Sequence, residues 1–183
     1  RATTMVTVSA KSKLHESGLA GVEIIDQLRR SKIEFVVAVP DIVTCDGLLW
    51  PLTNAADITV VPVCKEDEGV SICAAMSYCD RRALLLIQHT GFLDSINAIR
   101  AIAVEYELPI CIMVGLQGME PDRKLKDSDS YGIRIMEPIL DAMGIDHGTL
   151  REAEDAKMIT AAIDGAYTKS RPFVFLIGNS PSS

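Results

Sequence analysis

Three stretches of the sequence place polar or charged side chains directly after short apolar runs typical of β-strands. They are Pro40–Asp41, Lys65–Glu68 and Gln88–Gly91, which follow the runs 33–39, 58–63 and 83–88. In parallel α/β sheets, ligands bind outside the carboxyl ends of the strands. We therefore expect the functional site to be assembled from these three strand ends, with carboxylates, an imidazole and amide groups available for proton transfer and hydrogen bonding.

Each stretch also has a purely structural explanation. Asp41 follows a proline and suits a plain β-turn. Acidic residues such as Asp67 and Glu68 favour the first turn of a helix because they complement its dipole. A lone histidine such as His89 is more often structural than catalytic. Spacing alone does not decide between these explanations and a chemical role.

Several familiar sites are not supported by the sequence. No GxGxxG motif follows a strand, and there is no GxxxxGK[ST] phosphate loop. The three histidines, His15, His89 and His147, lack metal-ligand spacing. We therefore expect no metal ligands in this chain and no Ser-His-Asp triad.

The elements that position these residues alternate between strand and helix. Apolar runs at 33–39, 58–63, 83–88, 109–115 and 173–178, with a sixth near Ile145–His147, predict strands. Uninterrupted apolar runs suit strands that are buried on both faces. Helical periodicity lies between them, marked by Val22, Ile25 and Leu28 first and by Ala156, Ile159, Ile163 and Ala166 last. The pattern predicts an α/β, doubly wound, mainly parallel sheet of about six strands with helices on both faces.

Length and composition are those of one globular domain. The 183 residues form a single unit, 1–183, in which we expect 1–13 to be a flexible segment and not a secretion signal. The net charge of −7 argues against nucleic-acid and anionic-membrane partners. No apolar run approaches the roughly 20 residues that span a bilayer. Five cysteines without paired CxxC spacing are expected to be reduced core residues of a cytoplasmic protein.

Two expected helices, 66–79 and 92–106, carry apolar or small residues all round. Such helices are buried on several sides, and part of that burial is expected from another subunit. The segment 116–132 is polar and too long for an ordinary connection. It is either a mobile lid or partner-contact segment, or a solvated surface insertion.

Taken together, the motifs resemble the pyrimidine-binding domain of thiamine-diphosphate enzymes. The similarity is greatest to the α subunit of sulfopyruvate decarboxylase and to the matching half of phosphonopyruvate decarboxylase. It runs from about Leu19 to Gly178. It rests on "EFVVAVPD", "VPVCKEDEGVSICAAMSY", "LIQHTGFLDSINAI", "LPICIMVG" and "PILDAMGI".

The resemblance implies a role for one acidic residue in particular. Glu66 matches the glutamate whose carboxyl group hydrogen-bonds the cofactor's aminopyrimidine and favours the tautomer that deprotonates the thiazolium carbon. Further site residues are implied at the other strand ends. They are Pro40 and Thr90 toward the cofactor, and Asp41, Gln88 and His89 toward the substrate. Asn97, in the helix that follows, either bonds the substrate or caps neighbouring backbone.

The resemblance also implies a partner. In this family the diphosphate and Mg²⁺ are held by a domain that carries a GDG motif, and this sequence has none. We therefore expect a separate β subunit to bind Mg²⁺ and the diphosphate of thiamine diphosphate, in an α2β2-type assembly that acts on a small 2-oxo acid.

One departure from the family pattern bears on the chemistry. Where related enzymes read QNSG or QSSG, this chain reads "QHTG", so His89 replaces a small polar residue. In related benzoylformate decarboxylases a histidine at this turn transfers protons, and His89 is expected to do the same. An anionic substrate group would need a cation, for which the candidates are Lys65, Arg123, Lys124 and Lys126. Carboligation and a non-catalytic assembly subunit are the alternatives.

Overall fold

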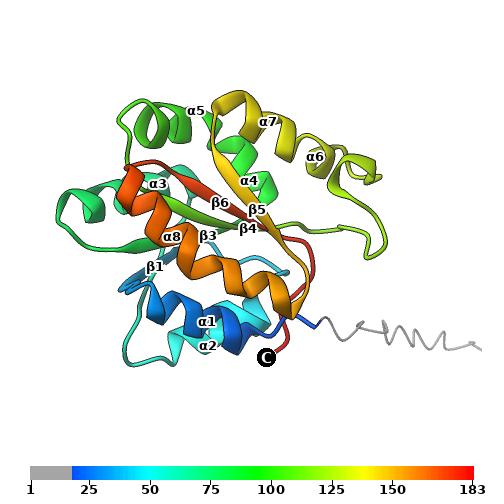
Figure 1. Cartoon of the computed structure of the whole chain (residues 1–183), viewed down its shortest axis with the longest axis horizontal. Coiled ribbons are helices and arrows are strands. Elements are labelled where there is room, and N and C mark those ends of the chain that lie inside the picture. The colour runs from blue at the N-terminus through cyan, green and yellow to red at the C-terminus, as the bar shows by residue number, and fades with distance from the viewer. Residues whose placement is uncertain (1–17) are drawn as a thin grey trace, which may run out of the picture.

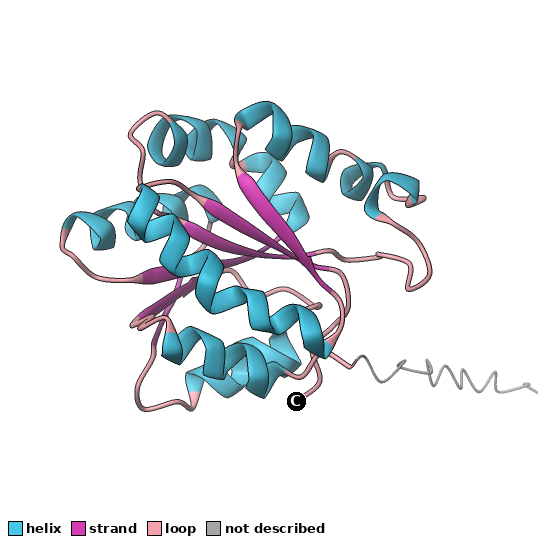
Figure 2. Ribbon diagram, in the orientation of Figure 1, coloured by secondary structure: helices cyan, strands magenta, loops and turns pink. Residues whose placement is uncertain are grey.

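The computed structural model describes residues 18–183, so the expectation for 1–13 lies outside the described residues. Six strands form one sheet in the order β2-β1-β3-β4-β6-β5, and every neighbouring pair is parallel (Figure 2). The strands are β1 (Phe35–Ala38), β2 (Thr59–Pro62), β3 (Ala83–Gln88), β4 (Cys111–Gly115), β5 (Asp146–Leu150) and β6 (Phe173–Ile177). The predicted six-stranded α/β fold is confirmed, including the sixth strand.

Alternate residues of the central strands face two separate cores. In β3, Leu84 and Leu86 belong to one hydrophobic cluster, whereas Leu85 and Ile87 belong to the other. All of these side chains are buried, which explains why the strand sequence is continuously apolar.

The helices cover both faces of the sheet (Figure 1). One face packs on α1 (Gly21–Arg30), the π-helical turn η1 (Cys45–Leu49), α2 (Trp50–Thr53), η4 (Ala153–Lys157) and α8 (Met158–Lys169). The other packs on α3 (Glu66–Tyr78), α4 (His89–Asp94), α5 (Ile96–Ala98), the π-helix η2 (Ile99–Val104), α6 (Tyr131–Arg134) and α7 (Met136–Met143). Within residues 18–183, no helix has the length and apolar character needed to cross a membrane.

The structure corrects two predicted helices. The single helix expected over 92–106 is α4, α5 and η2 in succession, and it begins earlier, at His89. In α1, Val22 is 60% exposed, while Ile24, Ile25 and Leu28 form the buried face. The sequence-based prediction placed Val22 on the buried face of this helix, but Ile24 lies there and Val22 points away from the sheet.

Two burial predictions also need correction. β2 is an edge strand paired only with β1, so Thr59 and Pro62 are exposed and the strand is not buried on both faces. All five cysteines are free, as expected for reduced thiols, but Cys64 and Cys79 are exposed. Both lie at the ends of α3, where the chain reaches the surface.

The segment 116–132 is held in place by hydrogen bonds and contains the short helix η3 (Leu125–Asp127). The Arg151 guanidinium, which follows β5, donates to the carbonyl oxygens of Glu120, Pro121 and Arg123. The Glu120 carboxylate accepts hydrogen bonds from the Ser128 hydroxyl and the Asp129 amide. The segment therefore has a defined conformation at the carboxyl edge of the sheet.

Candidate active site

The connections of the sheet define a crevice between β1 and β3. The chain passes from β1 outward to β2, crosses back to β3 on the other side of β1, and continues to β4. The carboxyl ends of the strands flanking such a reversal diverge and leave room for a ligand. Asp41 follows β1 and His89 follows β3, so two of the expected site residues border this crevice.

Asp41 is buried, and its carboxylate organises the loop after β1. Its Oδ1 accepts hydrogen bonds from the Val43 amide at 2.7 Å and the Thr44 amide at 3.2 Å, while its Oδ2 accepts from the Thr44 hydroxyl. The carboxylate also lies against the backbone of Gly115, where an added Cβ would come within 2.6 Å of Oδ1. Burial raises the pKa of Asp41, and these hydrogen bonds oppose the rise.

The acidic residues at the start of α3 have different contacts. Asp67 pairs with Lys65 at 3.2 Å and accepts a hydrogen bond from the Glu68 amide. Glu68 reaches back to accept a hydrogen bond from the Cys64 amide at 3.3 Å. These are the helix-start roles that acidic residues commonly have.

Glu66 differs from both neighbours. Within residues 18–183 its carboxylate has no hydrogen-bond or ion-pair partner, although the side chain is half-buried. It lies across the first turn of α4, where a Cβ added at Gly91 would come within 2.1 Å of Glu66 Oε1. The structure therefore brings the start of α3 to the end of β3 and leaves a free carboxylate there.

His89 begins α4 and is 5% exposed. Its Nδ1 is buried and has no hydrogen-bond partner among the described residues. Burial lowers the pKa of His89, whereas a backbone hydrogen bond with Gly115 and the charge of Asp41 oppose this effect. Gly132, in α6, lies on the imidazole, since an added Cβ there would be 3.3 Å from Nε2 and Cδ2. The lowered pKa favours the neutral imidazole of His89 near neutral pH.

The remaining predicted residues lie nearer the surface. Thr90 is exposed and donates its hydroxyl hydrogen to Gln88 Oε1 at 2.7 Å, so these two side chains are together. Pro40 is exposed beside Asp41. Asn97 is exposed on α5, and its Oδ1 accepts hydrogen bonds from the Arg100 guanidinium. Within the described part of the chain, Asn97 makes no polar contact with Glu66 or His89.

Two of the proposed anion-binding cations already have partners. Lys65 bridges Asp67 and Asp94, and these carboxylates raise its pKa. Arg123 pairs with Asp129 at 2.6 Å. Lys124 and Lys126 are exposed on the 116–132 segment.

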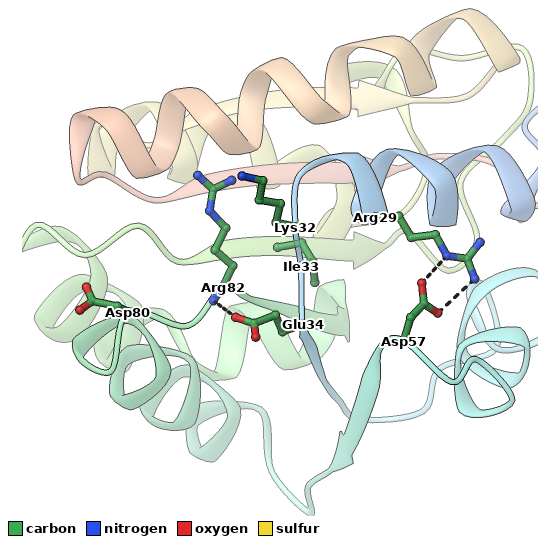
Figure 3. A pocket seen from close by; sticks show the side chains of 7 residues that line it. All are labelled: Arg29, Lys32, Ile33, Glu34, Asp57, Asp80 and Arg82. Atoms are coloured by element: carbon green, nitrogen blue, oxygen red, sulfur yellow. Dashed lines mark hydrogen bonds and ion pairs between the residues drawn. The ribbon is translucent and has the colours of Figure 1, made fainter.

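A depression of the described surface lies at the opposite edge of the sheet. It encloses about 480 Å³ among residues that precede β1, β2 and β3 (Figure 3). Several of its charges are already paired: Arg29 with Asp57, Glu34 with Arg81, and Arg82 with Asp164. It shares no residue with the strand ends described above, so we do not place the site there. Elsewhere in residues 18–183, no group of three or more His, Cys, Asp or Glu side chains could hold a metal ion.

Sequence reasoning missed the residues that shape the site without polar groups. Gly91, Gly115 and Gly132 lie against Glu66, Asp41 and His89, respectively. Ile42 and Tyr131, 74% and 69% exposed, are large apolar side chains next to Asp41 and Gly132. The only sequence signal was the presence of glycine at strand ends and helix starts, which can mark a close approach.

Curated relatives match this chain at low identity. "Sulfopyruvate decarboxylase subunit alpha" of Methanococcus maripaludis is 35% identical over 91 residues, which are 48% of this chain and 52% of that protein. The subunit of the same name from Methanocaldococcus jannaschii is 27% identical over 157 residues, 84% of this chain and 89% of the relative. A sulfopyruvate decarboxylase of Methanosarcina acetivorans is 24% identical over 85% of this chain and 39% of its own length. The matches thus span about half or less of the first and third relatives, and no family model matches the chain.

Solved structures share the fold at lower identity. A 2-oxoglutarate:ferredoxin oxidoreductase from Magnetococcus marinus, solved with 2-oxoglutarate, coenzyme A and succinyl-CoA bound, superposes with a TM-score of 0.62. The match covers 88% of this chain and 29% of that one at 14% identity. The chain is therefore a distant homologue of the sulfopyruvate decarboxylase α subunits over most of its length, with the fold of a thiamine-diphosphate enzyme domain.

Proposed function

We propose that this chain is the α subunit of a thiamine-diphosphate-dependent 2-oxo acid decarboxylase that converts sulfopyruvate, or a close relative, to the aldehyde and CO2. The enzyme is a carboxy-lyase that needs a separate β subunit. The homology to subunits named α supports this proposal.

The free carboxylate of Glu66 is the observation that carries the proposal. The imino tautomer of a bound aminopyrimidine carries a ring N–H that needs an acceptor, and Glu66 is the acidic residue of α3 whose oxygens are not used within residues 18–183. Its half-buried position at the end of β3 limits competition from water. The donor and acceptor groups present therefore fit the pyrimidine half of thiamine diphosphate.

His89 supplies the second chemical group. Its imidazole, whose lowered pKa favours the neutral form, can accept a proton from the substrate or return one to the product carbon. Thr90 and Pro40 are proposed to contact the cofactor. Asp41, Gln88 and Asn97 are proposed to face the substrate. Asp41 would contribute mainly by fixing the conformation of the loop after β1, whose amides donate hydrogen bonds to its carboxylate.

The cofactor supplies the electron sink for decarboxylation, taking up the electrons of the bond that breaks when CO2 leaves. Its diphosphate and Mg²⁺ are assigned to the β subunit, since this sequence lacks the GDG motif expected for that half. An α2β2-type assembly would place Glu66 at the junction of the two chains.

Replacement of Glu66 tests the proposal. In the pair reconstituted with its β subunit and thiamine diphosphate, Glu66→Gln should lower kcat on sulfopyruvate by about 10²–10⁴-fold, since the amide cannot exchange a proton with the pyrimidine. The rate of CO2 release measures this.

The matched control is Glu68→Gln, which removes the same charge two residues away. Glutamine can still accept the Cys64 amide, so Glu68→Gln should retain activity and the folded state. Full activity of the Glu66→Gln pair would exclude the assignment.

A second candidate keeps the cofactor and changes the substrate. The presence of His89 in place of a small polar residue favours testing phosphonopyruvate and aromatic 2-oxo acids beside sulfopyruvate. Product analysis with and without an added aldehyde separates decarboxylation from carboligation. A β subunit that turns over substrate at full rate alone would instead indicate a non-catalytic assembly role for this chain.

A further inference from the structure

Gly91 has an unusually close neighbour for a residue in a helix. A Cβ built on its backbone would lie 2.1 Å from Glu66 Oε1, 2.2 Å from Cδ and 2.4 Å from Cγ. These distances are shorter than any ordinary van der Waals contact between heavy atoms. The Glu66 side chain therefore occupies the space that a side chain at position 91 would need.

Backbone conformation does not explain why position 91 is a glycine. Among the described glycines only Gly118 and Gly144 have positive φ angles. Gly91 has a backbone that any residue can adopt, and it lies in the first turn of α4. Alanine would be favoured there on helix propensity alone. The requirement for glycine is thus steric and comes from Glu66.

Other contacts between α3 and α4 are too weak to fix the carboxylate. The ion pair between Lys65 and Asp94 spans 3.4 Å, and its side chains are 60% and 63% exposed. Exposed pairs of this kind contribute little to stability. Glu66 has no hydrogen-bond partner within residues 18–183, so packing against Gly91 is what determines where its carboxyl group lies.

We infer that Gly91 is a positioning residue for Glu66: its missing side chain lets the carboxyl group lie at the end of β3, where the proton exchange with the pyrimidine is to take place. This inference rests on the proposed function for its catalytic consequence. The contact itself does not depend on that function.

The first experiment measures the contact in the full chain without partner or cofactor. Gly91→Ala displaces one flexible, half-buried glutamate side chain and no backbone, so the variant should fold. Its melting temperature should fall by roughly 2–4 °C, because the clash outweighs the higher helix propensity of alanine. In a chain that already carries Glu66→Ala, Gly91→Ala should not lower the melting temperature, because the glutamate atoms that would clash are absent. The matched control is Gly165→Ala in α8, where no atom lies within 4 Å of the added Cβ.

The second experiment measures the consequence in the reconstituted pair. Gly91→Ala should lower kcat by about 10²-fold, the usual effect of displacing a reacting group by about 1 Å, with little change in the KM for substrate. Gly165→Ala should change neither.

The outcomes separate this inference from the proposed function. An equal loss of melting temperature in both backgrounds would show that Gly91 does not contact Glu66 and would overturn the inference. An active wild-type pair with undiminished kcat in Gly91→Ala would also overturn it and leave the proposed function intact. An inactive wild-type pair would overturn the proposed function, while the thermal cycle would still establish the contact.

Discussion

At the scale of single residues, the site combines two titratable groups whose charged forms are both disfavoured by burial. The pKa of His89 is lowered and that of Asp41 is raised, with burial as the largest cause in each case. Their mutual attraction opposes both shifts but is the smallest of the influences on each group. A neutral imidazole next to a hydrogen-bonded carboxylate is suited to accept a proton near neutral pH.

The lowered pKa of His89 predicts a loss of stability on acidification. Above the unfolded value of 6.5, both states hold a neutral imidazole. As the pH falls below 6.5, the unfolded chain takes up the proton first, and unfolding becomes easier until the folded pKa is passed. His89→Gln should therefore flatten the pH dependence of the free energy of unfolding just below pH 6.5. Urea titrations of the full chain over this range measure it.

Asp41 acts in the opposite sense. Its raised pKa contributes stability that is complete below 3.8 and is lost as the pH rises through the folded value. The Asp41→Asn variant should therefore keep the pH dependence of the free energy of unfolding just below pH 6.5 that we assign to His89. If the free energy of unfolding depended on pH equally in the wild-type and His89→Gln chains, the prediction for His89 would be contradicted.

The sequence indicates some of these residues and not others, for a physical reason. Polar groups after apolar runs identify the strand ends, so Asp41, Glu66 and His89 could be named as candidates. Helical spacing could not choose Glu66 over Glu68; the resemblance did. Gly91 could not be recognised, because the atom that excludes a side chain there belongs to a residue 25 positions away in the chain. Contacts of this kind appear only once the elements are packed.

At the scale of elements, local periodicity predicts the strands better than the helix after β3. Buried parallel strands carry a continuous apolar signal, so their approximate bounds are visible. The helix expected over 92–106 is interrupted at Ser95 and continues as the π-helix η2. A π-helical turn keeps apolar residues at nearly helical spacing, so composition does not reveal it.

Arg151 links the end of β5 to the 116–132 segment. Its guanidinium donates to three backbone carbonyls of that segment. Arg151→Met keeps the aliphatic stem but removes these donors, so the carbonyls of Glu120, Pro121 and Arg123 lose their partner. A hydrogen bond to a charged group contributes about 1.5–3 kcal/mol, and we expect local opening of the segment to become easier by roughly this amount.

Hydrogen exchange of the amides in 120–130 measures the effect of Arg151→Met. The control is Arg171→Met, which removes an exposed guanidinium whose one ion-pair partner within residues 18–183 is Glu107, at 3.6 Å. Protection of these amides should fall in the first variant and persist in the second. Unchanged protection in Arg151→Met would show that the segment is held by its internal contacts alone, such as those of Glu120 with Ser128.

At the scale of the whole molecule, the free thiols report on folding and on assembly separately. Cys73 and Cys111 are buried, and burial raises the pKa of both, that of Cys111 to about 12. Because the thiolate is the reactive form, neither should react with a disulfide reagent until the chain unfolds globally. Cys64 and Cys79 are exposed and should react in the native chain.

The two exposed thiols lie at opposite ends of α3, which makes them a matched pair for locating the partner subunit. Cys64 precedes Glu66 by two residues, at the carboxyl edge of the sheet, whereas Cys79 caps the other end of the 13-residue helix, roughly 20 Å away. If the β subunit and cofactor close over Glu66, assembly should slow the reaction of Cys64 severalfold and leave Cys79 reactive. Rate constants for the Cys64→Ser and Cys79→Ser chains, each of which keeps one of the two exposed thiols, are measured with and without the partner. Protection of Cys79 alone would place the partner at the amino edge of the sheet, beside the charged depression, and would separate Glu66 from the subunit junction on which its proposed role depends.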